Sequence, residues 1–185
     1  MSPLRRRLLF GVPLALVSAG GAAMYTLLER MRTDQYDPRA FPSPLLGKPL
    51  PAFSLPGTGG LPGFANTDLT APPRPVLVNW FSSWCAVCPQ EAPQLAALAR
   101  QGVPVWGIDY EDTPTALAEF LATNGTPYSR IGADKSGLTA INWGVYGVPE
   151  TFLIDKTGIV RWHFAGALTD ELVAERLQPL LEQYA

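Results

Sequence analysis

The stretch VLVNWFSSWCAVCPQEAP, residues 76–93, contains both cysteines of this 185-residue chain, two residues apart. They stand where an apolar, strand-like run gives way to a helix-like run. A thiolate at the start of a helix is stabilised by unpaired backbone N–H groups and by the positive end of the helix dipole, so it becomes a nucleophile near neutral pH. The pattern therefore predicts a redox site in which Cys85 attacks and Cys88 resolves.

The cysteine count leaves few other uses for this pair. With no further thiol, any disulfide is either Cys85–Cys88 or intermolecular, and the short ring of the former adds little stability, which favours a bond kept for its reversibility. Two alternatives stay open: a pair of buried apolar cysteines and a two-thiolate copper(I) carrier. Structural zinc normally takes four Cys or His ligands, whereas the chain adds only His163, which we expect to be a surface or internally satisfied strand histidine. We therefore expect no metal site and no cofactor beyond the cysteine pair.

The N-terminal segment predicts a membrane anchor, residues 1–32. Three arginines, Arg5 to Arg7, precede 21 uncharged residues, 8–28, which are long enough to cross a bilayer and longer than the usual apolar region of a secretory signal. Small residues at 18–23 leave cleavage open. The arginines favour a cytoplasmic amino end, so the rest of the chain is expected to be exported.

The remainder of the chain is acidic. Residues 1–32 hold five of the 14 basic groups and one of the 16 acidic groups, so the other residues carry nine basic and 15 acidic groups, a net charge of −6. This balance excludes an electrostatic footprint for nucleic acid. The proline-rich residues 33–46 are typical of a linker, and residues 47–185 are of a length for one ordinary domain.

Strand and helix signals alternate along this domain, which predicts an α/β fold. Strands are expected at residues 75–82, 103–109, 151–155 and 159–164, the last two as a hairpin, and helices at 89–100, 114–123 and 170–183. Thr169 is the expected N-cap of the last helix. The first strand leads directly into the cysteine pair, which places the sulfurs at the carboxyl edge of the sheet.

Two segments resemble a known family. Residues 76–93 are similar to the active-site segment of thioredoxin-like proteins, and GVYGVPETFLIDKTGIV, residues 144–160, to their cis-proline segment. Together with GKPLPAFSLP, residues 47–56, they most resemble the DsbE/CcmG family of thiol:disulfide interchange proteins (TlpA-like, thioredoxin superfamily). The resemblance implies a thioredoxin fold with a mixed central sheet flanked by helices.

The family also implies a function. Its members are anchored in the inner membrane by one helix, with the redox domain in the periplasm, and act as reductants during cytochrome c biogenesis. Apocytochrome c or its heme-ligation partners are the implied clients, and an inner-membrane protein of the DsbD/CcdA type is the implied electron donor. A general periplasmic reductant or oxidant of the same fold, a copper(I) carrier and a non-catalytic assembly scaffold remain as alternatives.

The resemblance assigns an acid and a proline to the redox site. Asn79 stands where thioredoxins have a proton-relaying aspartate, and an amide cannot relay a proton in that way. Glu91, one turn after Cys88, matches the family's acidic position and is the expected proton acceptor, the alternative being a solvated helix-face glutamate. Pro149 is expected to form a cis peptide with Val148, whose backbone stays available to a client peptide.

Further residues in or near the predicted site match positions of the family. Tyr146 and Glu150 match residues that line an acidic groove in the family, with edge-strand residues of no special role as the alternative. Trp84 is expected to shield the sulfurs, unless it is simply a core residue. Pro93 matches a helix-kinking proline. Residues 109–112 resemble an acidic insert that helps to shape the client surface, but a solvated loop is the simpler interpretation.

Overall fold

The computed structural model describes residues 16–29 and 43–185, which belong to two separate units of the chain. Residues 16–29 form one helix whose side chains are almost all exposed. Within the described residues, no helix has both the length and the apolar character needed to span a bilayer. Residues 1–15 and 30–32 of the predicted anchor, and residues 33–42 of the predicted linker, lie outside the described residues. Residues 43–46 of that linker already contact the domain, because Leu45 packs against its core.

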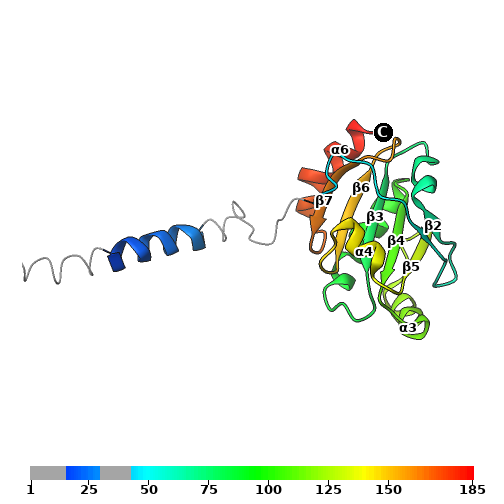
Figure 1. The fold of residues 1–185 in the computed structure, drawn as a ribbon, viewed down its shortest axis with the longest axis horizontal. Coiled ribbons are helices and arrows are strands. Elements are labelled where there is room, and N and C mark those ends of the chain that lie inside the picture. The colour runs from blue at the N-terminus through cyan, green and yellow to red at the C-terminus, as the bar shows by residue number, and fades with distance from the viewer. Residues whose placement is uncertain (1–15, 30–42) are drawn as a thin grey trace, which may run out of the picture. The chain divides into compact units, whose positions relative to one another are not determined.

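Five strands of residues 43–185 form a mixed sheet in the order β5-β4-β3-β6-β7 (Figure 1). The central strand β3 (Val76–Phe81) pairs in parallel with β4 (Val105–Tyr110), which pairs in parallel with β5 (Arg130–Asp134). On its other side β3 pairs antiparallel with β6 (Glu150–Ile154), and β6 pairs antiparallel with β7 (Val160–Ala165). A separate two-stranded sheet joins β1 (Ser54–Leu55) to β2 (Phe64–Ala65). The predicted α/β class and mixed sheet are confirmed.

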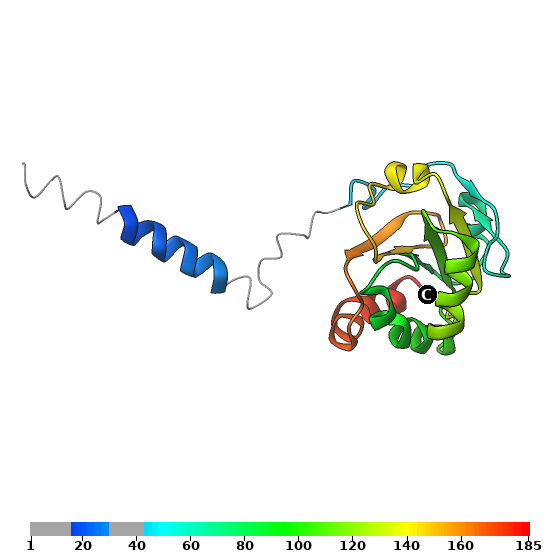
Figure 2. The same cartoon turned by 90° about the horizontal axis from the view of Figure 1, so that it is seen from below.

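Helices cover both faces of the sheet (Figure 2). One face packs against α2 (Ala92–Arg100), α3 (Pro114–Asn124) and the C-terminal helical segment, and both cysteines belong to this core. The other face packs against α4 (Leu138–Trp143), η1 (Asn66–Thr70) and the small sheet. Because β3 is covered on both faces, it forms from a continuous apolar run broken only by Asn79.

The predicted helix at 89–100 is divided in two. A 3₁₀ turn, η2 (Cys88–Glu91), precedes α2, and Pro93 stands in the first turn of α2. Since a proline has no N–H to donate to the carbonyl four residues earlier, the regular α-helical ladder cannot run through this position. The proline therefore marks the point where the active-site turn becomes the long helix.

The C-terminal helix is also interrupted. It consists of α5 (Asp170–Leu172), a π-helical turn η3 (Val173–Leu177) and α6 (Gln178–Gln183). Pro179 lacks the N–H that would donate to the Glu175 carbonyl. The N–H of the residue before it, Gln178, donates to the Val173 carbonyl, five residues back, which is the π-helical spacing. The predicted N-cap is confirmed, because Thr169 Oγ1 accepts the Leu172 N–H at 3.1 Å.

β5, α4 and the small sheet were not predicted from the sequence. β5 is a five-residue strand that contains Gly132, and α4 has only six residues, so neither shows a long periodic pattern. Gly132 faces Leu55 and Phe64, and a Cβ there would lie only 2.8 Å from the Leu55 side chain. The glycine thus allows the small sheet to pack closely on β5.

Asp155 holds the β6–β7 hairpin. Its Oδ1 accepts the N–H groups of Thr157 and Ile159 at 2.8 and 3.0 Å, and its Oδ2 accepts Arg161 Nε at 2.6 Å. Burial alone would raise the pKa of Asp155, but these donors outweigh it and hold the pKa below its usual value. A lowered carboxyl pKa stabilises the fold above the unfolded pKa, and this contribution is lost as pH falls through the folded pKa.

We expect Asp155→Ala to lower the free energy of unfolding by about 2–3 kcal/mol at pH 7, because several donors lose a charged acceptor. Urea denaturation at pH 7 and at low pH measures this, with the exposed Glu119→Ala as control. The deficit should shrink at low pH. An equal deficit at both pH values would contradict the assigned role of the carboxylate.

Candidate active site

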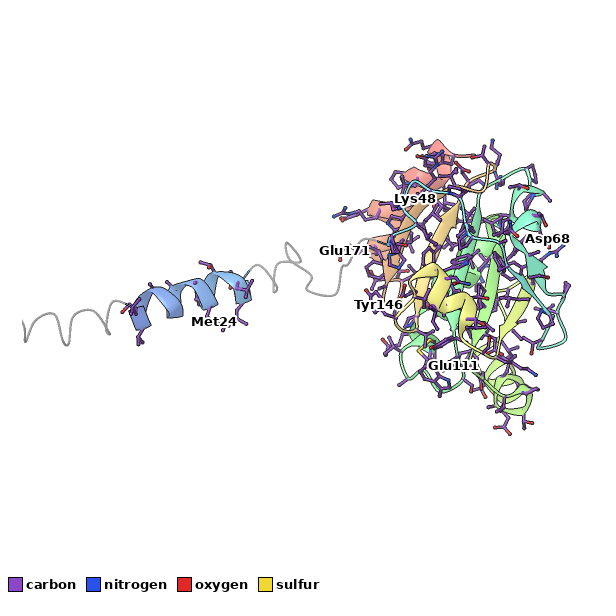
Figure 3. The ribbon with its side chains drawn as sticks, in the orientation of Figure 1. Met24, Lys48, Asp68, Glu111, Tyr146 and Glu171 are labelled. Atoms are coloured by element: carbon purple, nitrogen blue, oxygen red, sulfur yellow. A yellow bond between two sulfur atoms is a disulfide. The ribbon has the colours of Figure 1, made fainter. Side chains whose placement is uncertain are left out.

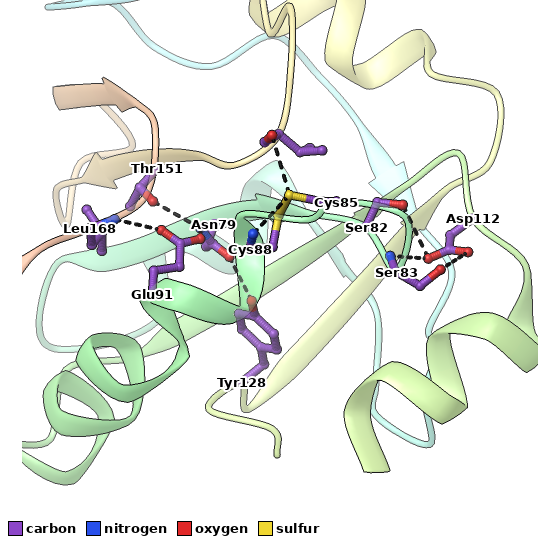
Figure 4. The surroundings of a disulfide bond; sticks show 11 residues. Asn79, Ser82, Ser83, Cys85, Cys88, Glu91, Asp112, Tyr128, Thr151 and Leu168 are labelled. Atoms are coloured by element: carbon purple, nitrogen blue, oxygen red, sulfur yellow. Dashed lines mark hydrogen bonds between the residues drawn. A yellow bond between two sulfur atoms is a disulfide. The ribbon is translucent and has the colours of Figure 1, made fainter. Parts of the chain in front are cut away.

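The cysteine pair is a disulfide at the carboxyl end of β3 (Figure 4). The Cys88 N–H donates to Cys85 Sγ at 3.0 Å, so a backbone donor at the start of η2 already points at this sulfur. This is the arrangement that stabilises a thiolate on Cys85 after reduction. The carbonyl oxygen of Val148 lies 3.5 Å from the same sulfur. Cys85 therefore has a donor on one side and the cis-proline loop on the other.

Asp112 holds the loop between β3 and Cys85. Its carboxylate accepts the Ser83 N–H at 2.6 Å and the hydroxyls of Ser83 and Ser82 at 2.8 and 3.3 Å (Figure 4). Burial alone would raise the pKa of Asp112, but the Ser83 donors and the Thr113 N–H outweigh burial and lower the pKa. The carboxylate thus stays charged and fixes the approach of the chain to the disulfide.

Glu91 lies at the end of the turn that starts with Cys88, and it is 1% exposed. Side chains three residues apart in a 3₁₀ turn lie one above the other, which places Glu91 on the side of Cys88. Its Oε1 accepts Asn79 Nδ2 at 2.8 Å and its Oε2 accepts the Leu168 N–H at 3.0 Å (Figure 4). Desolvation outweighs both donors and raises the Glu91 pKa to about 7.

Asn79 links Glu91 to two other elements. Its Nδ2 also donates to Thr151 Oγ1 at 3.0 Å, and its Oδ1 accepts the Tyr128 hydroxyl at 2.7 Å (Figure 4). Desolvation, followed by the charges of Glu91 and Asp109, raises the pKa of Tyr128 well above its usual value, so the phenol keeps its proton. The amide therefore acts as a neutral bridge within the core face that contains the cysteines.

The Val148–Pro149 peptide is cis, as predicted. The next residue, Glu150, is 1% exposed and turns its carboxylate back onto the loop: Oε1 accepts the N–H groups of Tyr146 and Gly147 at 3.0 and 3.2 Å. Its Oε2 lies 2.7 Å from His163 Nε2 on β7. The buried pair thus connects the cis-proline loop to a strand of the sheet.

Comparison with known proteins agrees with this geometry. Residues 46–163 match the family model described as AhpC/TSA family. The chain is 39% identical over 168 residues to the thiol:disulfide interchange protein HelX of Rhodobacter capsulatus, covering 90% of this chain and 92% of that one. It is 36% identical over 182 residues to the thiol:disulfide interchange protein DsbE of Escherichia coli K12, covering 98% and 97%. The chain belongs to the DsbE/HelX family of thiol:disulfide interchange proteins.

Solved structures show the same fold. A putative DsbE from Chlorobium tepidum superposes with a TM-score of 0.60 at 28% identity, covering 73% of this chain and 95% of that one. This similarity and the Cys85–Cys88 pair identify a thioredoxin-like thiol:disulfide oxidoreductase. The expected family membership and enzyme class are therefore confirmed.

Several alternatives for single residues are settled by burial. Glu91 is buried, so the solvated helix-face interpretation is wrong. Trp84 is 58% exposed and touches Tyr110 edge-on, with ring centres 6.1 Å apart, so it is not a core residue. Tyr146 is also 58% exposed (Figure 3). His163 was expected to be either a surface histidine or an internally satisfied strand histidine, and its contact with Glu150 shows that it is the second.

Two expectations need correction. Glu150 is expected to line an acidic groove, but its carboxylate is buried and accepts hydrogen bonds from the cis-proline loop, because two backbone N–H groups and His163 offer it partners inside the fold. Residues 109–112 form a solvated loop only in part: Asp109 and Tyr110 belong to β4, with Asp109 3% exposed, whereas the exposed Glu111 and the half-buried Asp112 follow the strand. Desolvation, followed by the nearby charge of Asp112, raises the pKa of Asp109 to about 7.

Tyr128 and Thr151 are parts of the site that the sequence did not reveal, and Asp112 was named only within the acidic segment 109–112. Tyr128 is an isolated aromatic residue in a loop, and no local pattern shows that its hydroxyl meets Asn79, 49 residues earlier. The polar Thr151 within the apolar strand signal at 151–155 was the one available clue. Within the described residues, no group of three or more His, Cys, Asp or Glu side chains could hold a metal ion.

The Glu150–His163 pair gives a prediction for the cis-proline loop. His163→Leu should lower the free energy of unfolding by about 1–3 kcal/mol, because a buried carboxylate oxygen loses its partner. His163→Gln, which keeps an N–H donor at the end of the side chain, should retain most of the stability. Urea denaturation of the oxidised proteins measures both. Equal stability of the leucine variant and the parent would contradict this role.

Proposed function

We propose that this protein is a reductant of disulfides in exported polypeptides. The observation that carries the proposal is the environment of Cys85 Sγ: a backbone N–H at 3.0 Å that favours its thiolate, next to the loop of Val148 and Pro149. A loop beside a reactive sulfur can pair with an extended client segment through its backbone, and Pro149 lacks an N–H. Trp84 and Tyr146, both exposed, lie in the segments on either side of this point and supply apolar contact to the client.

The reaction has two exchange steps. The Cys85 thiolate attacks one client sulfur, a Cys85–client disulfide forms, and the other client sulfur leaves as a thiolate. Cys88 then loses its proton and attacks Cys85 Sγ, which forms the Cys85–Cys88 disulfide and releases the second client sulfur. The client gains two electrons and the protein is oxidised. The disulfide itself is the only redox group that this cycle requires.

Glu91 accepts the Cys88 proton in this scheme. Its carboxylate follows Cys88 by three residues in one 3₁₀ turn, and its pKa of about 7 matches proton exchange near neutral pH. The Asn79 amide does not ionise, but its Nδ2 donates a hydrogen bond to the Glu91 carboxylate at 2.8 Å. This bond keeps the ionised form of Glu91 accessible in spite of burial.

The biological setting follows from the resemblance of residues 47–56, 76–93 and 144–160 to the DsbE/CcmG family. We propose apocytochrome c or its heme-ligation partners as clients, with the redox domain in the periplasm and an N-terminal inner-membrane anchor. Oxidised protein is reset by an inner-membrane electron donor of the DsbD/CcdA type. The basic residues Arg5 to Arg7 and the uncharged stretch after them support this arrangement.

A trapping experiment tests the proposed reduction. Cys88→Ala should accumulate a covalent adduct through Cys85, because the resolving sulfur is missing, and the adduct should contain a c-type apocytochrome or a protein that ligates heme. Non-reducing electrophoresis and mass spectrometry detect it, and the double variant lacking both cysteines is the control. If the purified protein instead has the reduction potential of a strong oxidant, the reducing role is wrong.

The pH dependence tests Glu91. In single turnover with Ellman's reagent, the first thiol release reports attack by Cys85, and the second, which does not depend on reagent concentration, reports resolution by Cys88. We expect this second rate to rise with pH through about 7, where Glu91 ionises, and Glu91→Gln to slow it roughly 10²-fold and to remove that transition. Glu175→Gln, an exposed carboxylate on η3, is the matched control.

The free energy of unfolding of Glu91→Gln shows whether its slower resolution is caused by a destabilised fold. A carboxyl pKa raised from 4.5 to about 7 destabilises the fold as pH rises through that interval, because the unfolded chain ionises first. Glu91→Gln should therefore be more stable than the parent at pH 8, by up to about 3 kcal/mol. A variant that resolves normally would contradict the proposed proton transfer.

A further inference from the structure

We propose that Tyr128 is a positioning residue that orients the Asn79 amide and so holds a hydrogen-bond donor on Glu91. This inference rests on the proton-accepting role proposed above for Glu91. Tyr128 lies outside both sequence segments that carry the cysteines and the cis proline, and its hydroxyl reaches the redox site only through Asn79. The loop that contains Tyr128 is therefore a third part of the chain that contributes to the surroundings of Glu91.

An asparagine side chain can be turned over, which exchanges its oxygen and its NH₂ group. In the observed orientation Nδ2 uses its two hydrogens on Glu91 Oε1 at 2.8 Å and Thr151 Oγ1 at 3.0 Å. The turned amide would place Oδ1 against the carboxylate, two acceptors facing each other without a proton. Thr151 can donate or accept, so it does not select between the two orientations.

Tyr128 makes that selection. Its hydroxyl donates to Asn79 Oδ1 at 2.7 Å, and the phenol keeps its proton because burial raises its pKa well above the usual value. If the amide turned over, its NH₂ group would face the phenol, and the buried hydroxyl would lose Asn79 Oδ1, the acceptor of its proton within the described residues. The orientation that keeps this acceptor leaves the NH₂ group for Glu91. Glu91 therefore receives its side-chain donor because Tyr128 occupies the opposite end of the amide.

The ring of Tyr128 is held firmly in place. It stacks on Phe81 with ring centres 4.7 Å apart and planes inclined by 18°. Gly107 of β4 lies beneath both rings, and a Cβ there would be 2.7 Å from Phe81 and 3.1 Å from Tyr128. The stacking on Phe81, a residue of β3, and the close contact with the backbone of β4 hold the hydroxyl in register with Asn79 on β3.

Loss of the hydroxyl has a defined electrostatic consequence. Asn79 lowers the Glu91 pKa through its hydrogen bond, so an amide free to turn over would leave the carboxylate less stabilised and the pKa higher. The titratable groups that act on Tyr128 are Glu91 from η2 and Asp109 from β4. Both cysteines belong to the same core cluster, and Asp109 does not contribute to the shift of Glu91.

Tyr128→Phe in the full chain tests the inference, because it removes one oxygen and retains the ring that stacks on Phe81. The single-turnover assay with Ellman's reagent gives the resolution rate as a function of pH. We expect its midpoint to move up by about half to one pH unit, so that resolution at pH 6 slows about three- to tenfold while the rate at pH 9 is unchanged. Tyr184→Phe, at the C-terminal end, is the matched control.

A second measurement does not depend on turnover. Carbon-13 NMR of the Glu91 carboxyl in the oxidised protein follows its ionisation directly, and Tyr128→Phe should raise the Glu91 pKa by the same interval. Combining Tyr128→Phe with Glu91→Gln should give the pH profile of Glu91→Gln alone, because Tyr128 acts only through Glu91. A structural weakening would instead slow resolution at every pH.

The outcomes distinguish the two proposals. If Glu91→Gln removes the transition near pH 7 but Tyr128→Phe leaves the profile and the carbon-13 titration unchanged, the positioning role of Tyr128 is wrong and the role of Glu91 stands. If Glu91→Gln keeps the transition, the proton-accepting role fails, and the inference about Tyr128 fails with it.

Discussion

The burial of one ionisable carboxyl beside a reactive sulfur is the constraint on which this site depends. Glu91 is 1% exposed, and water contributes little to the stability of its charge. Three parts of the chain supply what water does not: η2 presents the side chain, Asn79 of β3 donates from one side, and the Leu168 backbone donates from the other. Desolvation has the largest effect and raises the Glu91 pKa, the two donors lower it, and the resulting pKa is about 7. The fold gives up stability at this point and gains a group that can exchange protons near neutrality.

Two other carboxylates, Asp112 and Glu150, have a structural role. Asp112 collects the donors of the loop before Cys85, and Glu150 collects the backbone donors of the loop before Pro149. These loops approach the disulfide from either side, and each is fixed by an acid whose partners lie within the protein. The acidic residues around the disulfide therefore differ: burial raises the Glu91 pKa to about 7, whereas the carboxylates of Asp112 and Glu150 fix the backbone of the two loops.

Much of this arrangement follows from local patterns. The apolar run of β3, the C-x-x-C spacing and the hairpin around Asp155 each place an element correctly, because each pattern lies within a few residues. The parts that the sequence does not reveal depend on distant contacts. The hydroxyl of Tyr128 reaches Asn79 across 49 residues, and Glu150 meets His163 across 13. Charge is also a poor guide to exposure here. The charged residues at 109–112 suggest a solvated loop, yet Asp109 belongs to a buried strand because β4 is flanked by two parallel neighbours. Short elements such as α4 and β5 are too brief to show a period.

Gly107 connects the site around the disulfide to β4, a strand that carries no cysteine. It is paired with Asn79 across β3 and β4, and the rings of Phe81 and Tyr128 occupy the space where a side chain would stand. Even a methyl group would crowd the phenol that donates to the Asn79 amide, so a substitution at this glycine would disturb the hydrogen bonds around Glu91 and leave every reactive atom in the chain chemically intact.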